Sequence, residues 1–122
     1  CRGHCRPGPP GLIPLLILRL AYEGPVHGYQ IIERVRKMTS GEYAPETGVV
    51  YTALRRMEQR GLLTSRWVEG AAGGDKRIYE ITESGIETLR EGLEALSARR
   101  RLFEELFVFY ERTWGDEGGE GD

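Results

Sequence analysis

The longest nearly uninterrupted apolar run of the chain extends from Leu12 to Tyr22, and it constrains the fold most. Pro14 and Arg19 are its only interruptions, and it falls well short of the roughly 20 residues that a membrane span needs. We therefore predict a buried helix over Leu15 to Tyr22, with Pro14 in its first turn. Because this helix is apolar on nearly all sides, the remaining chain must cover more than one of its faces.

The length and composition of the chain predict one soluble globular domain. It contains 122 residues, of which 39% are hydrophobic and 30% charged, as in ordinary globular proteins. Its two cysteines, Cys1 and Cys5, are too few and too close together to cross-link a secreted fold. No secretory leader is recognisable at the start of the sequence, so we expect a cytoplasmic protein with no membrane partner.

Two further helices are predicted from apolar residues that recur at helical spacing. The helix from His27 to Met38 directs three side chains toward a core: Ile31, Ile32 and Val35. The helix from Glu46 to Arg60, ended by Gly61, buries Val50, Leu54 and Met57. Its opposite side is polar and rich in hydrogen-bonding groups, which come from Gly48, Thr52, Arg55, Arg56 and Gln59.

A β-hairpin and a long helix are predicted to follow. The stretches Leu62 to Val68 and Arg77 to Ile81 are rich in β-branched and aromatic residues and flank a Gly-rich tip. Thr82 can cap the next helix, in which apolar residues follow alternating steps of three and four, with Arg100 in one seam position. The fold class is therefore mainly α with a small β-hairpin, a winged helix-turn-helix plus a long C-terminal dimerisation helix.

Four segments follow from this pattern. Residues 1–11 are expected to be a flexible arm rich in Cys, Gly and Pro. Residues 12–82 form the winged-helix DNA-binding domain, and residues 83–114 form the C-terminal dimerisation helix. Residues 115–122 are acidic and rich in Gly, so a disordered tail is expected there.

The distribution of charge favours nucleic acid as a partner of one part of the chain only. The net charge is −2, which argues against a globally basic DNA-coating protein. Basic residues outnumber acidic ones between Tyr51 and Tyr79, whereas acidic residues dominate after Ile81. Binding to duplex DNA must therefore use the locally basic segment.

In a winged helix-turn-helix, the third helix can enter the major groove while the hairpin lies along the adjoining backbone. The side chains suit these roles, because arginine and glutamine pair with base edges and cations neutralise phosphates. The predicted DNA-binding residues are Gly48, Tyr51, Thr52, Arg55, Arg56, Gln59, Arg66, Lys76 and Arg77. The alternative is a solvated helix face with ordinary surface arginines, and a winged helix could also bind a protein partner.

Three blocks of sequence resemble the PadR family of bacterial transcriptional regulators. They are residues Gly24 to Ile31 (GPVHGYQI), Gly48 to Leu63 (GVVYTALRRMEQRGLL) and Lys76 to Gly85 (KRIYEITESG). The resemblance implies a dimeric winged-helix protein, commonly a repressor, and it is closest to the short subgroup with a single C-terminal helix. Ile78 replaces a frequent aromatic residue of the family, and the hairpin tip is longer and richer in Gly.

The apolar stripe of the last helix could pack on its own domain or pair with a partner chain. We favour a homodimer, because this stripe and the apolar first helix together exceed what one small domain can cover. The predicted dimer interface comprises Leu15, Leu16, Leu89, Leu93, Leu96, Phe103, Phe107, Tyr110 and Trp114. The aromatic members could also surround an unidentified small-molecule effector at the dimer centre, which would change the spacing of the third helices and release DNA.

Several single residues carry alternative interpretations. His27 is predicted to cap or pack the second helix, and Tyr29 to lie in the core. Trp67 and Tyr79 are predicted to cover the third helix as hairpin residues. Tyr51 could pack its ring while its hydroxyl reaches a phosphate.

No cofactor is required by this prediction, and no catalytic residues are expected. The chain has two histidines and lacks a nucleophile elbow, a phosphate-binding Gly loop and paired carboxylates in an evident apolar pocket. Cys1, His4 and Cys5 could together hold zinc or another thiophilic metal. They are one ligand short of a closed structural site, and the alternative is a disordered arm that merely contains them.

Overall fold

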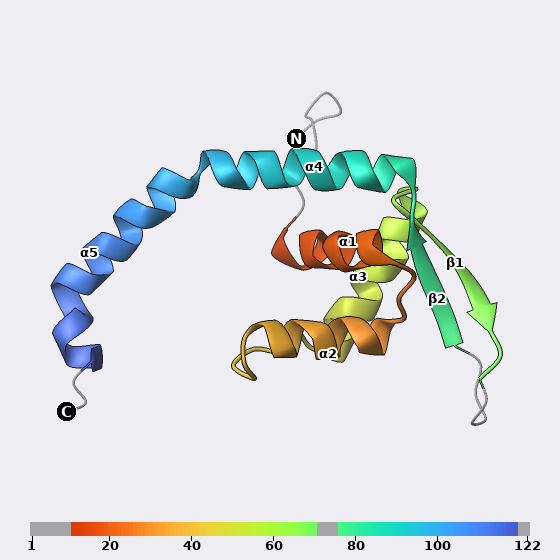
Figure 1. Ribbon diagram of the computed structural model, residues 1–122, viewed down its shortest axis with the longest axis horizontal. Coiled ribbons are helices and arrows are strands. Elements are labelled where there is room, and N and C mark those ends of the chain that lie inside the picture. Colours follow the sequence, from red (N-terminus) through yellow and green to blue (C-terminus); the bar gives the residue numbers. More distant parts are fainter. Residues whose placement is uncertain (1–10, 71–75, 120–122) are drawn as a thin grey trace. The chain divides into compact units, whose positions relative to one another are not determined.

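The computed structural model describes residues 11–70 and 76–119 and has the predicted order of elements (Figure 1). The five helices and two strands of this part of the chain are α1 (Leu12–Glu23), α2 (Gly28–Met38), α3 (Thr47–Gln59), β1 (Leu63–Val68), β2 (Lys76–Ile81), α4 (Glu83–Ala98) and α5 (Arg100–Gly119). Three helices followed by an antiparallel hairpin form a winged helix-turn-helix. The predicted fold class, mainly α with one small hairpin, is confirmed.

Helix α1 is the centre of the hydrophobic core. Ile17, Leu18 and Leu20 are completely buried, because α1 contacts α2, α3 and β2. The prediction that several elements cover this helix is therefore confirmed. Burial of each such side chain stabilises the fold by about 1.5–3 kcal/mol relative to its exposure in the unfolded chain.

Helix α3 is amphipathic in the predicted sense. Val50, Leu54 and Met57 are all buried in the core, and they lie on one face because they are spaced by four and three residues. The opposite face is thereby fixed toward solvent.

The hairpin is tied to the segment that precedes α2. Strands β1 and β2 pair in a register that sets Leu63 opposite Ile81 and Ser65 opposite Tyr79. The amide of Val26 donates to the carbonyl oxygen of Tyr79 at 3.0 Å, and the amide of Tyr79 donates to the carbonyl oxygen of Val26 at 2.7 Å. This bridge holds the start of α2 beside β2.

The predicted helix cap at Thr82 is confirmed. The amide of Gly85 donates to Thr82 Oγ1 at 3.0 Å, and Thr82 Oγ1 donates to the carbonyl oxygen of Gly61 at 2.7 Å. A Cβ on Gly85 would collide with the carbonyl oxygen of Leu62 and the side chain of Ile81. The first turn of α4 is thus fastened to the end of α3 at a place where only glycine fits.

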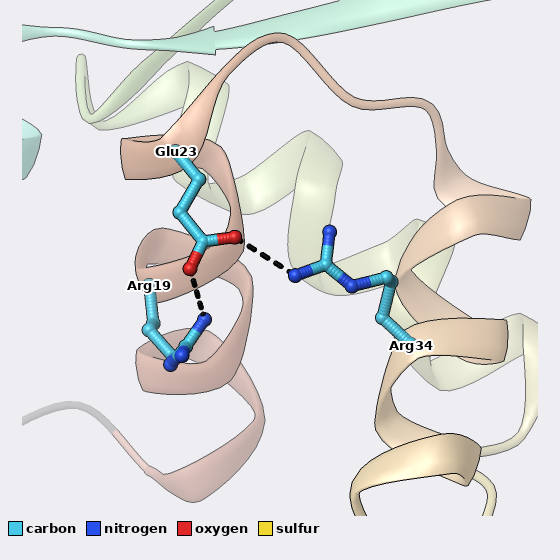
Figure 2. Close-up of polar contacts among 3 residues, drawn as sticks. All are labelled: Arg19, Glu23 and Arg34. Atoms are coloured by element: carbon cyan, nitrogen blue, oxygen red, sulfur yellow. Dashed lines mark hydrogen bonds and ion pairs between the residues drawn. The ribbon is translucent and has the colours of Figure 1, made fainter.

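A carboxylate at the end of α1 joins this helix to α2 (Figure 2). Arg34 donates to Glu23 Oε1 at 2.8 Å, and Arg19 donates to Glu23 Oε2 at 2.7 Å. The hydrogen bond from Arg34, with the nearby charge of Arg19, lowers the pKa of Glu23. All three side chains are about half exposed, so this cluster orients the two helices more than it stabilises them.

The structure corrects the predicted single helix over residues 83–114. A turn at Arg99 separates α4 from α5, where the amide of Arg99 donates to the carbonyl oxygen of Leu96 at 3.0 Å. The next residue, Arg100, puts a charge where the apolar seam requires a buried side chain. Spacing alone does not reveal such an interruption. The chain also divides into two compact units, residues 1–92 and 93–122, with the boundary inside α4 rather than at this turn.

The start of the predicted tail also needs correction. Helix α5 continues through Gly115 to Gly119, although residues 115–122 were expected to lack structure. Residues 115–119 contain three glycines, each of which costs a helix only about 1 kcal/mol relative to alanine, and no proline. The composition of this segment therefore did not fix the end of the helix.

Candidate nucleic-acid interface

The outward face of α3 presents the predicted side chains to solvent. Arg55, Arg56 and Gln59 are exposed, as is Gly48, whereas Thr52 is partly buried. No ion pair within the described residues involves Arg55 or Arg56. Their guanidinium groups are thus available for an anionic partner.

The hairpin divides its basic residues between two faces. Side chains alternate along a strand, so Arg77 shares a face with its cross-strand neighbour Trp67, while Arg66 lies on the opposite face. Arg66 contacts Glu80 at 3.2 Å on that outer face. The structure therefore brings Arg77 together with α3 and leaves Arg66 apart from it.

A polar cluster connects Arg77 to α3. Ser65 Oγ donates to the Glu58 carboxylate at 2.8 Å, and Arg77 Nε donates to Ser65 Oγ at 2.9 Å. Arg77 Nη2 lies 3.7 Å from Glu58 Oε1, and the guanidinium carbon lies 5.2 Å from the centre of the Trp67 ring. The wing arginine is therefore held by a carboxylate of α3 and stacked on an aromatic ring.

Sequence reasoning did not single out Glu58 or Ser65. Glu58 counted there only as an acid within a basic segment. Its role depends on the pairing register, which places Ser65 opposite Tyr79 and Trp67 opposite Arg77. No local motif encodes that register, so the sequence offered no signal for this cluster.

A pocket of about 530 Å³ lies where α2, α3 and the hairpin meet. Its lining residues come from the start of α2, from α3 and from both strands: His27, Gly28, Tyr29, Tyr51, Arg55, Trp67, Lys76, Arg77 and Tyr79. Four of the nine predicted DNA-binding residues thus share this pocket, namely Tyr51, Arg55, Lys76 and Arg77. The other five do not line it.

Gly28 allows the pocket to have this shape. A Cβ on Gly28 would lie 2.5 Å from ring carbons of Tyr51 and 2.7 Å from its hydroxyl oxygen. These distances are far shorter than the 3.5–4.0 Å separation of carbon atoms in good contact. The Tyr51 ring of α3 therefore rests directly against the backbone of α2.

Two titratable groups of the pocket have shifted pKa values. Burial, aided by the charge of Lys76, lowers the pKa of His27, which favours a neutral imidazole. Burial raises the pKa of Tyr79. The net positive charge of the pocket therefore comes from Arg55, Lys76 and Arg77.

The positions predicted for single pocket residues agree with the structure in some cases and not in others. His27 is the N-cap residue of α2, where its amide donates to Gln30 Oε1 at 3.0 Å. Tyr79 is buried as predicted, with 3% of its surface exposed. The core assignment of Tyr29 is wrong, because 60% of this residue is exposed. Trp67, which was predicted to cover the third helix, lines the pocket together with Tyr51 and Arg55 of α3 and is 62% exposed.

The predicted dimer residues divide into covered and exposed side chains. Leu15 and Leu89 belong to the core of their own chain, and with 6% and 8% of their surface exposed they could contribute little to an interface. Leu16 is partly buried. The exposed members lie in the unit of residues 93–122: Leu93, Leu96, Phe103, Phe107, Tyr110 and Trp114.

The metal hypothesis concerns Cys1, His4 and Cys5, which lie outside the described residues. Within residues 11–70 and 76–119, no group of three His, Cys, Asp or Glu side chains could hold a metal ion. No helix of these same segments is long and apolar enough to cross a membrane.

The fold and its polar face define a winged helix-turn-helix protein of the regulator type. The family model of the PadR-like transcriptional regulators matches residues 17–91, and this chain belongs to that family. The predicted resemblance to the PadR family is thereby confirmed.

Individual relatives agree with this assignment. The transcriptional regulator YqjI of Escherichia coli (strain K12) is 36% identical over 84 residues, which are 69% of this chain and 39% of that protein. The chain therefore spans about two fifths of the length of this curated relative. The solved structure of TA0346 of Thermoplasma acidophilum has a TM-score of 0.73 and 30% identity, covering 80% of this chain and 92% of that one.

A further solved structure contains DNA. Bacillus subtilis PadR in complex with operator DNA has a TM-score of 0.62 and 23% identity, and the match covers 67% of this chain and 46% of that one. At this identity, the match shows a shared fold.

Proposed function

We propose that this protein binds duplex DNA through the outward face of α3 and the inner face of its hairpin, and thereby regulates transcription. The observation that carries this proposal is the exposed pair Arg55 and Arg56 on a helix whose other face is fixed in the core. A single helix fits the major groove, which is about 12 Å wide. The operator complex of the Bacillus subtilis protein supports this use of the fold.

The side chains divide into two roles. Arg56, Gln59 and Thr52 would face base edges, where arginine pairs with guanine and glutamine with adenine. Arg77 on the inner face of the hairpin and Lys76 at the start of β2, which both line the pocket, would contact phosphates and fix the position of the protein on the duplex. Arg66, on the outer face of the hairpin, would contribute only to the general electrostatic attraction.

We further propose that the protein acts as a homodimer and represses transcription until an effector releases it. The support for a dimer is the exposed apolar surface of residues 93–116, in which Phe103 and Phe107 are 40% and 64% exposed. A two-fold dimer would present its recognition helices about 34 Å apart and read an inverted repeat. An effector held between the C-terminal helices would alter that spacing.

The DNA-binding proposal is tested by fluorescence anisotropy with a labelled random duplex across a salt series. Replacement of both Arg55 and Arg56 by alanine should weaken binding at least about tenfold, because it removes two cations from the α3 face that meets the duplex. Arg19→Ala is the control, since it removes one cation from α1, outside the α3 face, and should leave affinity within about twofold.

An absence of binding by the unchanged protein at low salt would contradict the proposal and would favour a protein partner for the α3 face. Equal affinity of the double variant and the Arg19→Ala control would contradict the assignment of this face.

A further inference from the structure

We propose that the pocket between α2, α3 and the hairpin binds a small planar aromatic molecule that carries an anionic group, and that this ligand competes directly with DNA. The competition rests on the proposed function, whereas binding of the ligand does not. The site differs from an effector site between C-terminal helices, because all nine lining residues lie in the unit of residues 1–92.

The first argument is the gathering of exposed aromatic rings around one cavity. Tyr29 and Trp67 are 60% and 62% exposed, and Tyr51 is 37% exposed, yet all three line the same pocket. Aromatic side chains are strong hydrophobic contributors when covered, and exposed apolar surface gathered at a concave site marks binding. A planar ring would cover these faces by stacking.

The second argument is the charge of the pocket. Arg55, Lys76 and Arg77 contribute three cations, and no carboxylate is among the nine lining residues. Arg77 shares its charge with Glu58, but no ion pair of the described residues involves Arg55 or Lys76. A neutral aromatic ligand would leave these cations without a partner, so the site selects an anion.

The two features together specify the ligand better than either alone. A bare phosphate group would satisfy the cations but leave the rings of Tyr29 and Trp67 in water. The volume of about 530 Å³ lies within the range of 300–1,000 Å³ that is typical of small-molecule sites. Aromatic carboxylates and nucleoside monophosphates both combine a planar ring with an anionic group.

Competition with DNA follows from shared residues. Tyr51, Arg55, Lys76 and Arg77 line the pocket and are also assigned to the DNA interface. A ligand that occupies these groups removes them from the duplex without any change of dimer spacing. Its effect is then a simple exclusion, in which the apparent Kd for DNA rises by the factor one plus the ratio of ligand concentration to ligand Kd.

The test uses the indole N–H signals of the full chain in a proton–nitrogen correlation spectrum. Trp67 lines the pocket, whereas Trp114 lies in the unit of residues 93–122 and serves as an internal control; Trp114→Phe assigns the two signals. The probes are 2-naphthoate and adenosine 5′-monophosphate. The matched controls are 2-naphthylmethanol, which is neutral, cyclohexanecarboxylate, which has no aromatic ring, and inorganic phosphate.

We expect at least one probe to shift the Trp67 signal in a saturable manner, with a Kd at least about tenfold lower than any control, while Trp114 stays unchanged. A response to naphthoate alone identifies an aromatic acid site, and a response to the nucleotide alone identifies a nucleotide site. Tyr29→Ala should weaken binding of that probe about fivefold and leave DNA affinity within about twofold, because Tyr29 is outside the proposed DNA interface.

The inference is overturned if neither probe shifts Trp67, if the controls bind equally well, or if a bound probe leaves the affinity for DNA unchanged. The affinity for DNA measured without probe keeps the two proposals separate. DNA binding without probe binding refutes only the pocket ligand. Probe binding without DNA binding refutes the proposed function and the competition with DNA, but not the ligand site.

Discussion

Replacement of Gly28 and of Gly48 by alanine should change stability in opposite directions. Both glycines lie in the first turn of a helix, so the intrinsic helix preference for alanine applies to each. A Cβ on Gly28 would lie 2.5 Å from the Tyr51 ring, whereas a Cβ on Gly48 would meet nothing within 4 Å. The two substitutions therefore differ in packing alone.

The magnitude follows from these distances. The Tyr51 ring would have to retreat by about 1 Å to restore a carbon contact of about 3.5 Å, and such overpacking costs about 1–3 kcal/mol. After a gain in helix preference of up to about 1 kcal/mol is subtracted, Gly28→Ala should still lower the free energy of unfolding, by up to about 2 kcal/mol. Gly48→Ala should raise it by up to about 1 kcal/mol.

Urea denaturation followed by circular dichroism measures both changes. At about 4–8 °C per kcal/mol for a domain of this size, the two variants should also melt on opposite sides of the unchanged protein. Equal shifts in the same direction, or a Gly28→Ala variant as stable as the unchanged protein, would refute the close contact between α2 and Tyr51.

Two further variants test the pocket region. Glu58→Gln should lower the free energy of unfolding by about 1 kcal/mol, because it removes the charge from the hydrogen bonds with Ser65 and from the ion pair with Arg77. The effect is this small because the side chains of Glu58 and Arg77 are 32% and 42% exposed. A double-mutant cycle with Ser65→Ala should show a coupling energy, and strict additivity of the two substitutions would contradict the cluster. His27→Gln should flatten the pH dependence of stability between pH 7 and pH 5. His27 shares its pocket with the titratable and charged groups of Arg55, Lys76, Arg77, Tyr51 and Tyr79, and its pKa is lowered in the folded chain. In the unfolded chain a histidine has a pKa of about 6.5, so as pH falls the unfolded chain binds a proton before the folded chain does. Stability therefore falls as pH drops through about 6.5 and levels off below the folded pKa; urea titrations at several pH values measure this slope, and identical slopes for both proteins would contradict it.

The sequence predicted those features that depend on periodicity within one element. The all-round burial of Ile17, Leu18 and Leu20 follows from the apolar run, and the two faces of α3 follow from the spacing of Val50, Leu54 and Met57. The cap at Thr82 is likewise a local signal. In each case the residues nearby in the sequence determine whether a side chain is buried, exposed or caps a helix.

Features that depend on contacts between elements were not predictable in the same way. To predict that Arg66 and Arg77 lie on different faces of the hairpin, one must know which face of the strands packs against α3. To predict the cluster of Glu58, Ser65 and Arg77, one must know the pairing register of the hairpin. The contact of Gly28 with Tyr51 joins two helices 23 positions apart in sequence. The turn at Arg99 was not predicted because the heptad spacing of apolar residues continues across it. Tyr29 was assigned to the core from its apolar ring, although it lies on the exposed side of α2.

Selection of bound duplexes from a random DNA library, followed by sequencing, tests the central claim most directly. The unchanged protein should enrich an inverted repeat whose half-sites lie one helical turn apart, about 10–10.5 base pairs between centres, and Arg56→Ala should lose preference at individual positions of each half-site. Recovery of random sequences with no enriched motif by the unchanged protein would contradict the claim that α3 reads DNA.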